Sequence, residues 1–327
     1  FVAFSKDGKY LVSSSFDSTC IIYDIESGEE VAKLEIEGIP MLAKFSEDNT
    51  KLYYVTLVNN DTCFYVYNTD TWQKQGGFVI NGQVKYADIK RDGSEILIAL
   101  EDNTEDQLTR RKMEDGSIID IIPRIKGIAL EQDEFDKPYI AASYSADGKN
   151  IILLTEGDIM KISLEDKTEI FKQEMYISPN DTRVLTESYN GEKIAVKAGT
   201  QVYILDGNSG EVVDEIYFPK VNMRYFAYNY DTNTVVGFGE NGNYSIWKDK
   251  IIVENNLSYG GGVPIEFIYL KDGSKILANS HESQTIKIID LKSRVLSEPI
   301  YARIIANSDN FSHMLLFDGS GFVISDD

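Results

Sequence analysis

Short apolar runs alternate with polar turns along the whole chain, and no stretch keeps the three-to-four-residue apolar period of a helix. The first unit shows the order most clearly, with the runs FVAFS, YLVSSS, CIIYDI and EVAKLEI separated by turns that contain Gly, Asp or Ser. Apolar runs of this length between such turns predict β-strands joined as antiparallel hairpins. The sequence therefore predicts an all-β protein with very little helix.

The same unit returns along the chain, each time with an Asp or Asn in its first turn. These anchors follow one another at steps of 37 to 55 residues, most of them close to 41. The anchors are Asp7, Asp48, Asp92, Asp147, Asn190, Asp231, Asp272 and Asp309. Self-similarity at roughly 40–45 residues, with four strands in each unit, is typical of the blades of a β-propeller.

We therefore predict a single β-propeller domain over residues 1–327, built from four-stranded antiparallel blades. Eight blades are expected, with seven as the alternative if the last unit pairs elsewhere. The predicted blades are 1–38, 39–82, 83–127, 128–175, 176–218, 219–262, 263–301 and 302–327. The chain begins at a first strand, and its last unit stops after a third strand. Because propellers close by letting one end of the chain supply a strand for the other end, we expect a fragment of a longer chain or a shortened last blade.

The position three residues before each anchor is expected to pack between neighbouring blades. Six of these eight positions carry a bulky apolar or aromatic residue, which is typical of flat sheets packed face to face. The eight residues are Phe4, Phe45, Ile89, Tyr144, Glu187, Tyr228, Tyr269 and Ala306.

The first unit resembles the WD-repeat family. It has DGK in its first turn, the small residues SSS in its second strand, Asp17 in the next turn, and the pair Tyr23-Asp24 closing its third strand. Later units keep the same acidic residue at Asp206 and Asp290. The Gly-His dipeptide of the family is absent, so the pattern is more similar to the degenerate WD-like propellers of large bacterial signalling proteins. The resemblance implies a scaffold or sensor module without chemistry of its own.

The chain is strongly acidic, with 53 Asp and Glu against 32 Lys and Arg and a net charge of −21. Nucleic-acid binders and proteins of anionic membrane surfaces use clusters of Lys and Arg, and the sequence holds no basic run. We therefore expect no nucleic acid and no membrane as a partner, whereas a protein or peptide of basic character fits the charge.

Two cysteines, Cys20 and Cys63, follow a Thr in the third strands of adjacent units. Equivalent positions on neighbouring blades lie too far apart for a disulfide, which needs Cα atoms within about 7 Å. We expect both to be small buried residues of a protein in a reducing compartment, which favours the cytoplasm.

No motif predicts a reaction. GFGENG at 237–242 matches the dinucleotide pattern G-x-G-x-x-G, but it joins two predicted strands, so we expect a turn. The two histidines, His281 and His313, belong to different units, which disfavours a catalytic triad or a zinc site. The sequence predicts no catalytic residue, no cofactor and no metal, with a calcium site left as a weaker alternative.

One constellation points to a partner. The longest step, 55 residues, contains the crossover IKGIALEQDEFDKPY, which leaves the same face of its blade as the turn at 101–107. Together these segments carry acidic residues with two aromatics among them. The predicted partner-binding residues are Glu101, Asp102, Glu105, Asp106, Glu131, Asp133, Glu134, Phe135, Asp136 and Tyr139. Acidic charge steers a basic segment, and buried aromatics supply binding energy.

The leading hypothesis is therefore a non-catalytic interaction or sensing scaffold that binds a protein or peptide on the crossover-loop face. One alternative is a propeller enzyme, lactonase- or lyase-like, with a site in the axial channel. Another is a propeller that binds a small ligand or calcium without turnover. The sequence leaves the oligomeric state open.

Overall fold

The structure is a computed structural model of the chain. It describes residues 2–5, 7–14, 19–100, 108–122, 139–155, 157–177, 185–188, 190–218, 223–230, 232–239, 243–248, 251–258, 266–269, 275–280, 285–293, 297, 303–307, 314–317 and 322–325. Within these ranges the chain forms thirty β-strands and no helix, which confirms the all-β prediction. Over the same residues there is accordingly no helix able to cross a membrane.

Three four-stranded sheets come first in the chain, and each pairs its strands antiparallel in sequence order. The first holds β1 (Val2–Phe4), β2 (Tyr10–Ser14), β3 (Thr19–Asp24) and β4 (Glu30–Glu35). The second holds β5 (Ile39–Phe45), β6 (Lys51–Val58), β7 (Asp61–Asn68) and β8 (Lys74–Ile80). The third holds β9 (Val84–Ile89), β10 (Glu95–Leu100), β11 (Leu108–Lys112) and β12 (Ile118–Ile122).

Five further sheets follow the same pattern, so the described residues form eight sheets in all. The fourth holds β13 (Tyr139–Tyr144), β14 (Asn150–Thr155), β15 (Asp158–Ser163) and β16 (Glu169–Glu174). The fifth holds β17 (Leu185–Glu187), β18 (Lys193–Ala198), β19 (Gln201–Asp206) and β20 (Val212–Tyr217). The sixth holds β21 (Met223–Asn229), β22 (Thr234–Gly239), β23 (Asn243–Lys248) and β24 (Ile251–Ser258). The seventh and eighth are three-stranded, with β25 (Glu266–Tyr269), β26 (Lys275–Ser280) and β27 (Thr285–Asp290), and with β28 (Arg303–Asn307), β29 (Met314–Phe317) and β30 (Phe322–Ser325).

The predicted fourth strand of the seventh unit falls largely outside the described residues. One of its residues, Ser297, is described and lies beside β27. Its backbone N–H donates to the carbonyl of Ile288 at 2.9 Å, and its Oγ accepts from the N–H of Ile288 at 2.9 Å. Ser297 therefore pairs with β27 at this point.

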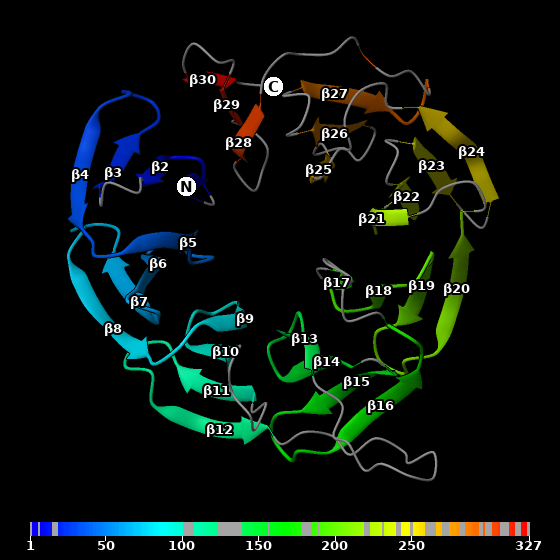
Figure 1. The fold of residues 1–327 in the computed structure, drawn as a ribbon, viewed down its shortest axis with the longest axis horizontal. Helices are drawn as coiled ribbons and strands as arrows, with labels where there is room; N and C mark the ends of the chain where they lie inside the picture. The colour runs from blue at the N-terminus through cyan, green and yellow to red at the C-terminus, as the bar shows by residue number, and fades with distance from the viewer. Residues whose placement is uncertain are drawn as a thin grey trace. The chain divides into compact units, whose positions relative to one another are not determined.

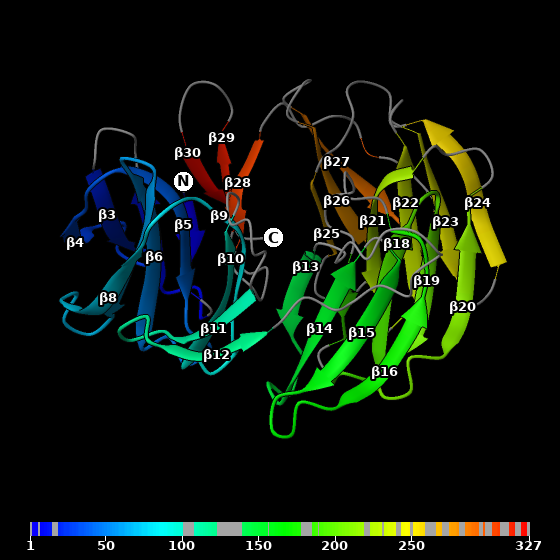
Figure 2. The same ribbon diagram turned by 60° about the horizontal axis from the view of Figure 1, so that its bottom comes forward.

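Contacts divide the chain into two compact units. The first comprises Phe1–Tyr144, Ile305–Leu315 and Ile324–Asp327, and the second comprises Ser145–Ile304 and Leu316–Val323. In the first unit the sheets β1–β4, β5–β8 and β9–β12 follow one another in chain order, as Figures 1 and 2 show from two directions. The single domain over 1–327 and its blade boundaries stay a prediction.

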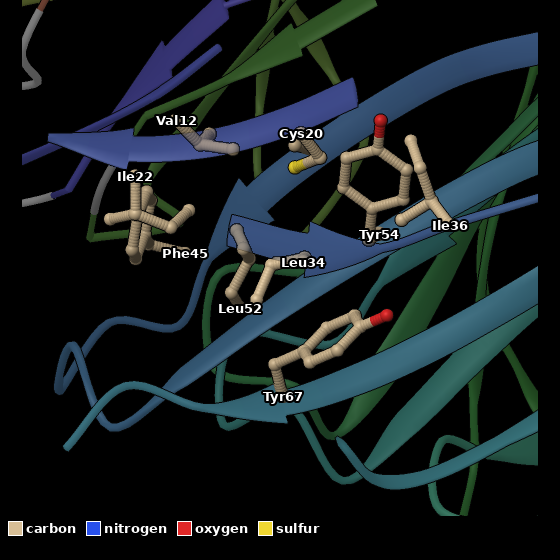
Figure 3. Close-up of a cluster of buried hydrophobic side chains, with 10 residues drawn as sticks. Val12, Cys20, Ile22, Leu34, Ile36, Phe45, Leu52, Tyr54 and Tyr67 are labelled. Atoms are coloured by element: carbon tan, nitrogen blue, oxygen red, sulfur yellow. The ribbon is translucent and has the colours of Figure 1, made fainter. Parts of the chain in front are cut away.

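The hydrophobic cores lie between consecutive sheets rather than inside any one of them. Figure 3 shows the first, where Val12, Cys20 and Ile22 from the first sheet meet Leu52 and Tyr54 from the second. A second core joins the second and third sheets, and in the second unit two more join the fifth sheet to the sixth and the sixth to the seventh. Because strand side chains alternate between two faces, each sheet can pack on a neighbour on either side.

The position three residues before each anchor behaves largely as predicted. Phe45, Ile89, Tyr144 and Tyr228 are buried, with 2 to 8% of their surface exposed. The side chains of Phe4, Tyr269 and Ala306 lie outside the described residues. Glu187 is the polar exception, and its environment is described below.

Both cysteines are free and buried, as predicted, and burial raises the pKa of Cys20 to about 12. Cys20 contributes to the core between the first two sheets.

The anchors close the first turn of their units through a repeated side-chain network. In the second sequence repeat the Ser46 hydroxyl donates to Asp48 Oδ1 at 2.6 Å and accepts from the N–H of Lys51 at 3.0 Å. Asp48 Oδ1 also accepts from Thr50 N–H at 3.0 Å. Hydrogen bonds to the charged carboxylate lower the pKa of Asp48 to about 2, the largest of them coming from Ser46. The same Ser-to-anchor bond occurs at Asp7, Asp147 and Asn190.

The acidic residues that suggested the WD-repeat resemblance cap the turn after the third strand. Asp24 Oδ1 accepts from the N–H and the hydroxyl of Ser27 at 2.9 and 3.0 Å, and Asp206 and Asp290 accept in the same way from Ser209 N–H and Ser293 N–H. Their role in this chain is therefore to fix turns. Asp17 lies outside the described residues.

Glycines that follow these caps have left-handed backbones, with φ of +70° at Gly28 and +73° at Gly210. A Cβ on Gly28 would meet nothing within 4 Å, whereas one on Gly210 would lie 2.3 Å from the ring of Phe171 on β16. Gly210 is thus required both by its backbone and by the close approach of the fourth sheet.

Candidate functional site

Nine of the ten predicted partner-binding residues lie outside the described residues: Glu101, Asp102, Glu105, Asp106, Glu131, Asp133, Glu134, Phe135 and Asp136. The tenth, Tyr139, begins β13, and its side chain is not described. The predicted acidic surface therefore stays a prediction. The strands on either side of these segments are described, and they show from which part of the third sheet the segments start.

Both acidic segments leave the third sheet at the edge that is formed by the ends of its strands, on the side where β9 begins. Leu100, the last residue of β10, pairs with Val84, the first residue of β9. Leu108 at the start of β11 pairs with Ile122 at the end of β12. The turn at 101–107 and the crossover after Ile122 therefore start where β9 begins.

A groove of about 450 Å³ opens at this same edge, between the second and third sheets. We call it the Met41 groove and define it by Met41, Leu42, Leu57, Thr62, Val84 and Tyr86. Its floor is formed by Phe64, Ile89 and Ile96, which are apolar core residues and almost fully buried. This volume lies within the usual range of ligand sites, roughly 300–1,000 Å³.

One wall of the groove is unusually apolar for an exposed strand. Met41 and Leu42, which line the groove from β5, are 55 and 39% exposed, and Ile39 at the start of the same strand is 44% exposed. Pro40 pairs with Thr56 and Leu42 pairs with Val55, so Met41 has no residue opposite it. Such a β-bulge re-aims the side chains around it and is common next to binding sites.

The entry of β5 is held close to β6 by a glycine. Gly38 has φ +85°, and a Cβ there would lie 2.4 Å from the carbonyl oxygen of Leu57. Any larger residue would push β5 away from the groove wall.

The opposite rim is the crossover from β8 to β9, and the turn before β7 fixes it. Asp61 Oδ1 accepts from Gly82 N–H at 3.0 Å, and Thr62 Oγ1 donates to the Gly82 carbonyl at 3.0 Å. Gln83 Nε2 donates to Asn60 Oδ1 at 2.6 Å. These bonds span 20 to 23 positions of sequence and make the rim a preformed structure.

Two charged residues line the groove, Lys44 and Asp88. Burial raises the pKa of Asp88, while the bond from Tyr144 N–H and the charge of Lys44 act in the opposite direction. Asp88 Oδ2 accepts from Tyr144 N–H at 2.8 Å, so this carboxylate ties β13 to β9. An acid with a raised pKa in a cleft is a candidate for catalysis, but here its hydrogen bond gives it a structural role.

Most of the residues that line the groove are apolar. No serine or cysteine with a histidine beside it lines the groove. Across the described part of the chain no group of three or more His, Cys, Asp or Glu residues could hold a metal. The arrangement offers apolar area, one exposed ammonium and a rigid rim.

A larger hollow of about 590 Å³ lies at the other edge of the same two sheets. Its walls include Lys51, Gln75, Lys112 and Glu114, long side chains of both charges. We assign no function to it.

A buried ion pair in the second unit accounts for Glu187. Lys161 Nζ donates to the Gly207 carbonyl at 2.7 Å and lies 3.6 Å from Glu187 Oε1, with the two side chains 7 and 10% exposed. Ala146 N–H donates to Glu187 Oε2 at 2.6 Å. Burial raises the pKa of Glu187, and the charge of Lys161 partly offsets this. Glu187 Oε1 makes no hydrogen bond and faces only the charge of Lys161, and we assign the pair to stability.

The loop at 237–242 is a strand-to-strand connection, as predicted. Gly237 and Gly239 belong to β22, and β23 begins at Asn243 and pairs antiparallel with β22. A phosphate cradle would need a helix after the loop. His281 and His313 lie outside the described residues.

Sequence reasoning missed the Met41 groove. The available signal is the run Ile39–Leu42, four consecutive residues without the polar alternation of a half-exposed strand. That run alone cannot distinguish a strand buried on both faces from one with an exposed apolar wall.

Solved structures of low sequence identity share the fold of this chain. The C-terminal WD40 domain of Sif2 aligns with a TM-score of 0.71 and 13% identity over 99% of this chain and 94% of that one. The β-propeller domain of Cps50 (Swd1) from Myceliophteria thermophila gives 0.57 and 10% over 86 and 93%. The dihydro-heme d1 dehydrogenase NirN, in complex with DHE, gives 0.70 and 13% over 97 and 70%.

These likenesses show a β-propeller fold, which confirms the predicted fold class. Neither a protein-family model nor a curated protein matches the sequence. The structural neighbours include both WD40 domains and a protein described as a dehydrogenase, so fold alone does not assign a function.

Proposed function

We propose that this chain is a non-catalytic interaction scaffold that holds a segment of a partner protein in the Met41 groove. The observation that carries the proposal is the apolar wall of β5, where Ile39, Met41 and Leu42 stay exposed beside a preformed groove. Fully burying one such side chain is worth about 1.5–3 kcal/mol, so a partner that covers the wall gains affinity without reshaping the protein.

A protein segment fits this groove better than a small polar substrate. Specific small-molecule sites place several convergent polar groups in an apolar pocket. Here the charged groups are Lys44 and Asp88, and Asp88 is already bonded to the backbone of β13. The long, unbranched side chain of Met41 can adapt to different apolar partners. The WD-like propeller fold is consistent with an interaction scaffold.

We further propose that the bound segment is basic on one side of its apolar anchor. The two predicted acidic segments depart from the sheet edge at which the groove opens, next to Val84. The net charge of −21 favours the approach of a basic partner over an acidic one. Charge would then set the encounter rate and orientation, while the apolar wall supplies most of the binding energy.

The test begins with peptides selected from a random twelve-residue display library on the wild-type chain. Selected peptides are then titrated by calorimetry against Met41→Glu and against Val79→Glu as a matched control. Val79 on β8 is 58% exposed and does not line the groove. We expect affinity to fall at least about tenfold with Met41→Glu, because apolar burial is lost and a charge is desolvated. Val79→Glu should leave it unchanged.

Equal affinity for the wild type and Met41→Glu would refute the groove as the binding site. The basic flank is tested separately by reversing the charges of Asp133, Glu134 and Asp136 together. Weaker binding that becomes insensitive to salt supports the acidic surface, and unchanged binding removes it from the proposal.

A further inference from the structure

A second groove, of about 350 Å³, lies in the second unit between the fourth and fifth sheets. We call it the Tyr176 groove and define it by Gln173, Glu174, Tyr176, Gln201, Tyr203 and Val212. Figure 2 shows β16 running beside the sheet that ends in β20, and the contact of Phe171 with the Gly210 position joins the two sheets below the groove. This volume lies at the low end of the range of ligand sites, and it is large enough to hold one long side chain.

Tyr176 is presented to solvent by a fixed backbone. The residues on either side of it are anchored, since Met175 N–H donates to the Gly157 carbonyl at 2.9 Å and Ile177 is fully buried. Tyr176 itself is 71% exposed. A large aromatic ring that is held in solvent leaves apolar surface exposed to water, which is unfavourable. A ligand that covers the ring removes this surface from water and gains binding free energy.

The second ring of the groove is set by a hydrogen-bonded triad on β19 and β20. The Tyr203 hydroxyl donates to Gln201 Oε1 at 2.9 Å, and Gln201 Nε2 donates to Glu215 Oε1 at 2.6 Å. Tyr203 and Glu215 are direct cross-strand partners. The triad holds the phenol in place and puts a carboxylate directly behind the groove wall.

The charged side chains at the groove are all acidic. Glu174 lines it and Glu215 stands behind it, while no Lys or Arg is among the described residues that line it. An aromatic face beside a carboxylate attracts a cation, by about 0.5–1 kcal/mol for an exposed cation–π contact and about 0.2–1 kcal/mol for an exposed ion pair.

We infer that the Tyr176 groove binds an arginine side chain of a partner protein segment. A guanidinium is planar, stacks on a tyrosine ring and can donate to a carboxylate and an amide oxygen at once, whereas an ammonium offers a single point charge. Glu174, Tyr176 and Gln173, which lie close together in sequence at the end of β16 and just after it, all line the groove and provide these three kinds of group. The inference does not depend on the Met41 groove, which lies in the other unit.

The probe is the blocked tripeptide acetyl-Gly-Arg-Gly-amide, compared with the same peptide carrying citrulline, which has the shape of arginine without its charge. Binding is followed by NMR on protein with ring-labelled tyrosine, with the Tyr176 signal identified by its loss in Tyr176→Ala. We expect the arginine peptide to shift the Tyr176 and Tyr203 signals, and the citrulline peptide to bind at least about threefold more weakly.

Two variants and one control sharpen the result. Tyr176→Ala, read through the Tyr203 signal, should weaken the arginine peptide about threefold or more, and Glu174→Gln should weaken it about twofold and reduce its salt dependence. Tyr217→Ala removes a 52% exposed tyrosine of β20 that does not line the groove, and it should change nothing. Equal shifts with citrulline, or no shift of either groove tyrosine by the arginine peptide, would overturn the inference.

Discussion

Replacing Lys161 with Met tests how much the buried ion pair between Lys161 and Glu187 contributes to the stability of the fold. The ammonium of Lys161 donates to the Gly207 carbonyl at 2.7 Å and lies 3.6 Å from Glu187 Oε1, with both side chains about nine-tenths buried. Met keeps most of the volume and removes the charge. Breaking a buried pair by deleting one partner costs about 3–5 kcal/mol, because the other charge is left without compensation.

Protonation of Glu187 limits that cost. Burial already raises the pKa of Glu187, and loss of the Lys161 charge, which lowers it, raises the pKa further. A carboxyl whose pKa is higher in the folded state than in the unfolded state loses stability as the pH rises through its folded pKa. We therefore expect Lys161→Met to lose about 3 kcal/mol of unfolding free energy at pH 7, and less at pH 5.

Urea unfolding followed by circular dichroism at both pH values measures this loss. Lys33→Met, at an exposed lysine of β4, is the control for the change of residue type. The double variant Lys161→Met/Glu187→Gln should recover more than half of the loss, because no buried charge remains. A loss below about 0.5 kcal/mol at pH 7, an equal loss at both pH values, or no recovery in the double variant would refute the assignment.

Three further predictions follow from local geometry. Gly28→Ala should lower the unfolding free energy by about 1–2 kcal/mol, because an alanine is strained in its left-handed backbone. Gly210→Ala should lose about 1–3 kcal/mol more, because its Cβ would also overlap the ring of Phe171. Equal losses of unfolding free energy for the two variants in urea would contradict this. Asp48 has its pKa lowered to about 2, so its contribution should be complete above about pH 4 and lost as the pH falls towards 2; a pH series on Asp48→Asn should show a smaller acid-dependent loss of stability than the wild type. Cys20, buried with a thiol pKa of about 12, should react with a thiol reagent at pH 8 after unfolding and not before; rapid reaction of the folded protein at that position would contradict its burial.

The turns and the strand positions of the fold could be predicted from the sequence. The anchor at Asp48 and the cap at Asp24 act within a few residues of themselves, so their patterns are visible in sequence. Strand positions follow the same logic, and the predicted second strand EILIAL is β10 (Glu95–Leu100) without adjustment. The absence of a disulfide between Cys20 and Cys63 followed from the repeat itself.

The site was less accessible to such reasoning. Ile39–Leu42 is a short apolar run like many others in the chain, and the exposure of Met41 depends on a bulge that becomes defined only when β5 pairs with β6. Glu187 stood out as a polar exception, yet its partner Lys161 lies on a strand of the preceding sheet. Tyr176 gave no signal, because one exposed tyrosine among 20 in the sequence is not distinctive.

The sequence by itself determined the strand order, the turn chemistry, the β-propeller fold class and the acidic net charge. These features depend on alternation, turn residues and composition, all of which are local or additive along the chain. The tertiary structure alone decided which apolar side chains stay exposed and which charges meet. Those outcomes depend on how consecutive sheets face one another, and sheet packing brings together residues tens of positions apart without leaving a periodic trace in the sequence.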